Sequence, residues 1–194
     1  MTKIILKSGR EKSLMRKHPW IFSGAIAKVN GRPEQGETVE ICDSAGRFLA
    51  WGAYSPESQI RIRIWSWNPN EKINPDFFLS RLKAAISVRA GLFIDFASQC
   101  TRSSDIVSMI HDFPSAVRLV NAESDGLPGF IVDRYGNTLV LQFLSAGAER
   151  WRQSLIDLLL DLSKFERIYE RSDVDVRKLE GFQSRVCPFV SYQP

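Results

Sequence analysis

The sequence contains few histidines and cysteines, the residues that could hold zinc or form a disulfide framework. Its 194 residues include two histidines, His18 and His111, and three cysteines, Cys42, Cys100 and Cys187. The cysteines are odd in number, widely spaced and never arranged as a Cys-x-x-Cys pair, which is typical of free thiols in a reducing compartment. We therefore expect no zinc site, no disulfide and no bound metal.

Long apolar runs and the common catalytic motifs are also missing. No stretch approaches the roughly 20 apolar residues that a membrane-spanning helix requires. The opening residues, MTKIILKSGREK, have no apolar core behind their charges and so do not form a secretion signal. No glycine-rich phosphate loop, nucleophile elbow or zinc-protease helix is present. We expect a cytoplasmic protein without membrane association, and we assign it no catalytic residue.

Positive charge is concentrated in the first third of the chain. Residues 1–70 hold 11 Lys and Arg against 6 Asp and Glu, whereas residues 71–194 hold 15 against 16. The formal net charge of +4 therefore arises entirely before residue 71. Such an asymmetry favours a polyanionic partner for the first part of the chain.

The most basic segment covers residues 10–26, where a short cationic helix is expected to lead into an aromatic strand. This order places positive charge beside ring faces, as contact with phosphates and unpaired bases requires. A solvated helix followed by a core strand is the alternative. Later strands add further cations and rings, and the predicted RNA-binding residues are Arg10, Lys12, Arg16, Lys17, His18, Trp20, Tyr54, Arg61 and Arg63.

The first 70 residues predict a strongly bent sheet or small β-barrel. Residues 3–6 are expected to form a strand, and residues 10–17 a helix of about two turns that Pro19 ends. The clearest alternation covers residues 60–67. It places Ile60, Ile62 and Ile64 on one face of a strand, and Arg61, Arg63 and Trp65 on the other. The sequence Asn68-Pro69-Asn70 is the predicted domain boundary.

The second part, residues 71–187, predicts a mixed α+β domain with strands around a central helix. Asn74 is expected to cap a helix. Residues 127–130 fit a type II turn, and residues 134–137 fit the loop of a β-hairpin. The fold class is therefore α+β and rich in strands.

Three further elements are expected in this part. Ser145 is predicted to cap an amphipathic helix. Residues 174–178 are predicted to form a strand, and Ser104 is predicted to cap a short helix over residues 105–110. The inner face of the helix after Ser145 is expected to be formed by Trp151, Leu155, Leu158 and Leu162.

Two alternative functions stay open at this point. Glu123, Asp125 and Asp133 surround a glycine-rich turn and could form the acid/base or magnesium site of a hydrolase, although ordinary turn chemistry explains Asp125 before Gly126. The chain could instead be an interaction module without RNA, which binds another chain or forms a homodimer.

Three segments resemble the bacterial large-subunit rRNA cytosine-C5 methyltransferases. Residues 9–26, GREKSLMRKHPWIFSGAI, are similar to the opening of the PUA domain of that family. Residues 122–137, AESDGLPGFIVDRYGN, and residues 169–181, YERSDVDVRKLEG, are similar to the hairpin and the end of its middle domain. The segments occur in the family's order and span most of residues 3–181.

The resemblance implies a PUA-type barrel for residues 1–70 and a substrate-positioning middle domain for residues 71–187. Residues 188–194 would then be the junction to a methyltransferase domain that is missing from this sequence, together with the nucleophilic cysteine and the S-adenosylmethionine (SAM) site of the family. We therefore expect no cofactor on this chain, and no methylation by it alone. The implied role is RNA binding and substrate recognition for methylation of a cytosine in 23S rRNA.

Overall fold

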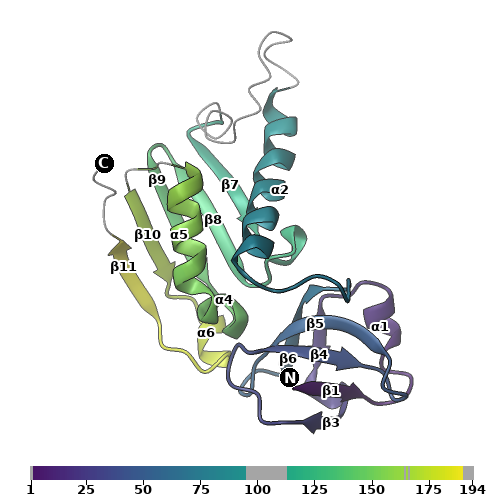
Figure 1. Ribbon diagram of the computed structural model, residues 1–194. Helices are drawn as coiled ribbons and strands as arrows, with labels where there is room; N and C mark the ends of the chain where they lie inside the picture. Colours follow the sequence, from purple (N-terminus) through teal and green to yellow (C-terminus); the bar gives the residue numbers. More distant parts are fainter. Residues whose placement is uncertain (1, 95–112, 164, 166, 190–194) are drawn as a thin grey trace.

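The computed structural model describes residues 2–94, 113–163, 165 and 167–189. Two β-sheets dominate the fold (Figure 1). Sheet A contains six strands in the order β2-β6-β5-β4-β1-β3, and sheet B contains five in the order β11-β10-β9-β8-β7. The protein therefore has a mixed, strand-rich α+β fold, as its sequence predicts.

Sheet A curls around a small apolar core. Its elements are β1 (Lys3–Leu6), α1 (Lys12–Met15), β2 (Trp20–Phe22), the 3-10 turn η1 (Ser23–Ala25), β3 (Ile26–Asn30), β4 (Thr38–Cys42), β5 (Phe48–Tyr54) and β6 (Ile60–Ser66). The predicted strand at residues 3–6 is confirmed. Ile62 and Ile64 of β6 lie in the core with Ile4, Leu14 and Ile41, because alternate residues of a strand point to the same face.

Helix α1 is shorter than the two turns predicted for residues 10–17. Lys17 adopts a left-handed backbone conformation with φ of 64°, and its N–H donates to the carbonyl of Leu14. The residue before a proline disfavours the helical conformation, so the chain leaves the helix before His18-Pro19. The result is a single helical turn between Lys12 and Met15.

Sheet B is covered on one face by two long helices, α2 (Pro75–Ile94) and α5 (Arg152–Ser163) (Figure 1). Its other elements are β7 (Ala116–Asn121), the 3-10 turn η2 (Ala122–Asp125), β8 (Phe130–Tyr135), β9 (Thr138–Phe143), α4 (Ala146–Arg150), β10 (Arg167–Ser172), α6 (Val176–Leu179) and β11 (Arg185–Phe189). A large apolar core fills the space between the sheet and the two helices.

Local signals in this part of the sequence are confirmed by hydrogen bonds. The Asn74 side chain accepts from the N–H of Phe77 at 3.0 Å, and that of Ser145 accepts from Ala148 at 3.2 Å. The turn at residues 127–130 is closed by the Phe130 N–H, which donates to the Leu127 carbonyl at 3.0 Å, and Gly129 has the positive φ of a type II turn. The predicted hairpin joins β8 to β9.

Two predicted elements differ from the structure, and one lies outside the described residues. The helix that Ser145 caps divides at Trp151 into α4 and α5, and its predicted inner face is fully buried at Leu155 but only partly buried at Trp151. The strand predicted for residues 174–178 is wrong: residues 176–178 belong to helix α6, where the Arg177 side chain is buried and ion-pairs with Glu149. The helix predicted after Ser104 falls on residues that are not described.

The two sheets meet in a shared core. Ala53 and Trp65 of sheet A belong to the apolar cluster of sheet B, where the Trp65 ring packs 5.2 Å from that of Phe78. Gly147 of α4 approaches this surface so closely that an added Cβ would lie 2.4 Å from the Ala53 Cβ. Strand β6 is therefore buried on both faces.

Candidate nucleic-acid interface

Helix α1 and the residues on either side of it present the predicted cations to solvent. The one buried side chain of the helix is Leu14, which is 2% exposed and anchors the turn in the sheet A core. Arg10, Lys12, Arg16 and Lys17 are all exposed, and no carboxylate of the described residues forms an ion pair with any of them. Their charge is therefore available to an anionic partner.

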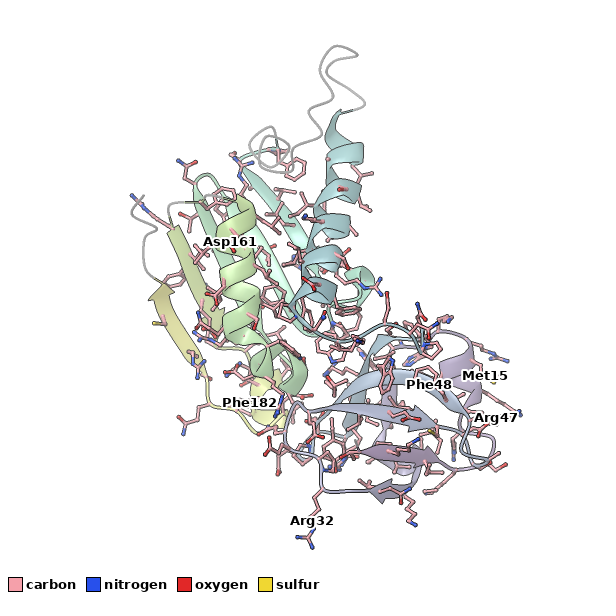
Figure 2. All side chains as sticks on the ribbon, in the orientation of Figure 1. Met15, Arg32, Arg47, Phe48, Asp161 and Phe182 are labelled. Atoms are coloured by element: carbon pink, nitrogen blue, oxygen red, sulfur yellow. The ribbon has the colours of Figure 1, made fainter. Side chains whose placement is uncertain are left out.

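Aromatic rings border this helix on one side. The Lys17 ammonium lies 5.1 Å from the centre of the Trp67 ring, and Trp67 Nε1 donates to the Leu14 carbonyl at 3.2 Å. A hollow of about 210 Å³ beside them is bordered by Met15 and Phe48, both labelled in Figure 2. Met15 is 68% exposed. An apolar floor and a cation thus lie next to each other.

Strand β2 borders the helix on its other side. The ring of His18 packs edge-on against that of Trp20, with centroids 5.8 Å apart. Phe22 is 50% exposed. A hollow of about 230 Å³ is bounded by Arg10 and Ser13 and by the strand residues Trp20 and Phe22. It offers a guanidinium and ring surfaces within one concave space, which suits a phosphate and an unpaired base.

Trp20 is held from the far side by a carboxylate of the second part of the chain. Its Nε1 donates to Glu123 Oε1 at 2.8 Å, and Arg63 Nη1 donates to the same oxygen at 2.8 Å. Arg63 also lies 5.5 Å from the Trp20 ring, in a cation–π arrangement. Trp20 and Arg63 are partners across β2 and β6, so the sheet register brings them together.

Arg63 is buried rather than presented on the surface. It is 8% exposed, and its second Nη donates to Glu180 Oε1 at 3.1 Å. Glu180 is 1% exposed and also accepts from the Ala146 N–H at the start of α4. The alternation predicted for β6 is correct, but the face that carries Arg63 and Trp65 is covered by the helices beside sheet B. Little of Arg63 is left for a polyanion to reach.

Tyr54 and Arg61 lie at the hairpin end of β5 and β6. The Arg61 guanidinium is 6.0 Å from the Tyr54 ring and donates to the Pro56 carbonyl. Within the described part of the chain, no hydrogen bond, ion pair or ring contact links them to α1 or to Trp20. The predicted residues therefore divide into three groups: the α1 cations with β2, the buried Arg63, and this hairpin pair.

The three carboxylates considered for a hydrolase are each bound by arginine. Glu123 pairs with Arg63, and Asp125 accepts two bonds from Arg89 at 2.7 and 2.8 Å. Asp133 accepts two bonds from Arg118 at 2.8 and 3.0 Å. No cluster of three potential metal ligands occurs among the described residues. The carboxylates are structural, and the hydrolase alternative is unsupported.

Cys42 is fully buried and unsuited to nucleophilic chemistry. Burial raises the pKa of its thiol to about 11, and the hydrogen bond from Sγ to Glu40 adds to the shift. The thiol is therefore protonated at neutral pH. Cys42 and Cys187 are not joined to each other by a disulfide.

Two features of this surface were missed in the sequence. The first is Phe22, a half-exposed ring beside Arg10. It follows Ile21, which is 4% exposed, and neighbouring residues of a strand face opposite sides of the sheet. Placing Ile21 in the core would therefore have indicated that Phe22 is exposed. The bond between Trp20 and Glu123 joins residues 103 positions apart. No local pattern could have indicated it.

The architecture places the first part of the chain in a known class. Residues 4–67 match the family model of the PUA-like domain. Two solved structures share the fold of all or most of the chain at low sequence identity. One, assigned as a SAM-dependent methyltransferase from Streptococcus mutans, has a TM-score of 0.71 and 18% identity, over 100% of this chain and 44% of that protein. The other, assigned as a methyltransferase and solved with SAH, has a TM-score of 0.69 and 19% identity, over 88% of this chain and 40% of that protein.

Several curated proteins are far more similar in sequence, and all are named ribosomal RNA large subunit methyltransferase I. The protein from Photobacterium profundum is 49% identical over 194 residues, which is 100% of this chain and 45% of the relative. Those from Erwinia tasmaniensis and Escherichia coli O127:H6 are 49% and 46% identical, over 93% and 99% of this chain and 42% and 44% of theirs. The chain thus spans less than half the length of these relatives. No helix in the described residues is long and apolar enough to cross a membrane.

Proposed function

We propose that this chain is the RNA-binding, substrate-recognition portion of a SAM-dependent methyltransferase that modifies a cytosine of 23S rRNA at C5. The observation that carries the proposal is the 46–49% identity, over almost the whole chain, to proteins named ribosomal RNA large subunit methyltransferase I. In this proposal residues 1–70 form an RNA-binding PUA domain, residues 71–187 position the substrate, and residues 188–194 lead towards a catalytic domain. The cytoplasm, where ribosomal RNA is modified, is its proposed location.

The exposed groups around α1 support an RNA-contacting role for this surface. Arg10, Lys12, Arg16 and Lys17 would neutralise phosphates, while His18 and the ring of Trp20 would contact an unpaired base. Tyr54 and Arg61 would extend the contact along the hairpin. Because Arg63 is buried between two carboxylates, its part in the proposal is to hold Trp20 and Glu123 in place.

In this proposal SAM binding and methyl transfer belong to the catalytic domain, and the described residues act on the RNA. Rossmann-like sites bind their ligand where a glycine-rich loop joins a parallel strand to a helix. Strand pairing among the described residues is mainly antiparallel, with parallel pairs only between β1 and β4 and between β9 and β10. What these residues offer to the reaction is the binding and orientation of RNA.

Salt-dependent binding to an rRNA hairpin tests the proposal. If about four phosphates are neutralised, log affinity should fall with log salt at a slope near −3, from the single-strand coefficient of about 0.7 per phosphate. Replacing Arg10, Lys12 and Arg16 together with alanine should reduce the slope to about −0.7. The matched control replaces Arg32, Lys72 and Lys83 with alanine and should leave most of the slope intact.

Absence of binding, or binding that does not depend on salt, would contradict the proposal. Arg32, Lys72 and Lys83 suit the control because they are exposed and lie outside α1 and β2. Arg32 projects from sheet A, as Figure 2 shows. Equal losses in the two triple variants would mean that net charge alone, and not the α1 surface, determines affinity.

A further inference from the structure

Sheet B has one face that none of the described helices covers. Helices α2 and α5 lie on the same side of the sheet (Figure 1). Burial follows this arrangement along β9, where the residues facing the helices are 0% exposed and those between them are only half-buried. On β10, Ile168 and Glu170 face the helices, so Arg167, Tyr169 and Arg171 point to the opposite, open face.

The open face carries arginines and tyrosines, with little negative charge. Its charged and aromatic strand residues are Arg118, Arg167, Arg171, Asp133, Tyr135 and Tyr169. Asp133 is the one carboxylate, and both of its oxygens are held by Arg118. Every cation on this face is an arginine, the side chain that binds phosphate through a two-pronged fork and stacks on planar groups.

Strand β10 brings these groups into a short repeat. Arg167, Tyr169 and Arg171 alternate along it, so consecutive members are about 7 Å apart on the same face. Tyr169 is paired across the sheet with Val140, and Arg167 with Thr138, so neither neighbour on β9 is charged. Arg171 pairs with Asp173 beyond the strand, whereas Arg167 has no carboxylate partner in the described part of the chain. A ring therefore lies between two guanidinium groups.

We propose that the open face of sheet B is a second RNA-binding surface, where an unpaired base stacks on Tyr169 and the flanking phosphates bind Arg167 and Arg171. The inference rests on the proposed function, since it adds a single-stranded segment of the same RNA to the contacts made at α1. Charge complementarity selects RNA over a protein partner, because the three arginines outnumber the two carboxylates that pair with them, Asp133 and Asp173, and so leave the face with a positive balance that suits a polyanion. Aromatic rings hold unpaired bases of any sequence.

The test uses a fluorescently labelled single-stranded oligouridine and the 194-residue chain. Tyr169→Val removes the ring and keeps a residue that favours strands, whereas Tyr169→Phe keeps the ring. We expect the first to weaken binding by about 5-fold or more and the second to bind like the wild type, since stacking on a ring is worth about 1–3 kcal/mol per base, or roughly 5- to 150-fold. Far-UV circular dichroism confirms that each variant is folded.

A second pair of variants measures the charge on the face. The double variant Arg167→Gln, Arg171→Gln should lower the salt slope of oligouridine binding by about 1.4, or about 0.7 per phosphate. The matched control, Arg32→Gln with Lys83→Gln, removes the same charge from exposed positions off this face and should change the slope much less.

The outcomes separate this surface from the proposed function. Unchanged affinity in Tyr169→Val, with loss in the Arg10, Lys12, Arg16 triple variant, would overturn the second surface and leave the proposed function standing. If the wild type binds neither the oligouridine nor the rRNA hairpin, the proposed function itself is overturned. Loss of self-association in Tyr169→Val, measured by sedimentation with RNA affinity unchanged, would make the face a protein interface and overturn the inference.

Discussion

Replacing Arg63 with methionine would remove the cation that two carboxylates share where sheet A meets the helices of sheet B. Arg63 is 8% exposed and Glu180 is 1% exposed, and their side chains are 3.1 Å apart. Removing one partner of a buried pair costs about 3–5 kcal/mol, because the remaining charge stays buried without compensation. Glu123 is less buried and keeps its bond from Trp20. Most of the cost should therefore come from Glu180, and we expect the free energy of unfolding to fall by about 3–4 kcal/mol.

Urea unfolding, followed by tryptophan fluorescence, measures this change. Lys178→Met is the matched control, since the side chains of Lys178 and Asp175 are 68% and 93% exposed and such a pair contributes about 0.2–1 kcal/mol. Adding Glu180→Gln to Arg63→Met should recover part of the loss, because the neutral amide removes the uncompensated charge. A loss below about 1 kcal/mol, with no recovery in the double variant, would refute the reasoning.

Three further changes test other contacts. Gly147→Val places side-chain atoms against buried neighbours and should destabilise the fold by roughly 2 kcal/mol or more, whereas Gly91→Ala, in open space on α2, should stabilise it by about 0.5–1 kcal/mol. Trp20→Phe removes the bond to Glu123 and should cost about 1.5–3 kcal/mol, and a loss near zero would mean that water replaces it fully. The pKa of Cys42 in the folded protein, about 11, lies above its ordinary value of 9.0, so folding favours the neutral thiol. The contribution of this preference to the free energy of unfolding is complete below pH 9 and is lost as the pH rises to 11. At about 1.4 kcal/mol per pKa unit, this loss is at most roughly 3 kcal/mol, and urea unfolding of Cys42→Ala should show a flatter dependence on alkaline pH.

The sequence predicted the elements whose signals are local. Asn74, Ser145 and the turn at residues 127–130 each form hydrogen bonds within a few positions, so their side chains and φ preferences determined the structure there. Alternation located β6 and its core face, because the side-chain period of a strand is a property of the chain itself. The exposed cations around α1 were also indicated locally, since Pro19 limits the helix and Leu14 is its one buried residue.

Contacts between distant segments were decided by tertiary structure alone. Arg63 looked like a surface cation because its own strand alternates normally, yet α4 and the turn after α6 bring Ala146 and Glu180 over that face. Arg177 is likewise buried, in helix α6 where a strand was predicted, and it ion-pairs with Glu149 of α4. The sequence by itself indicated β1, β6, the hairpin of β8 and β9, the two helix caps and the basic surface around α1. Which arginines are buried and which remain exposed depended on the packing of the two sheets, because burial is set by neighbours that the chain brings together only after it folds.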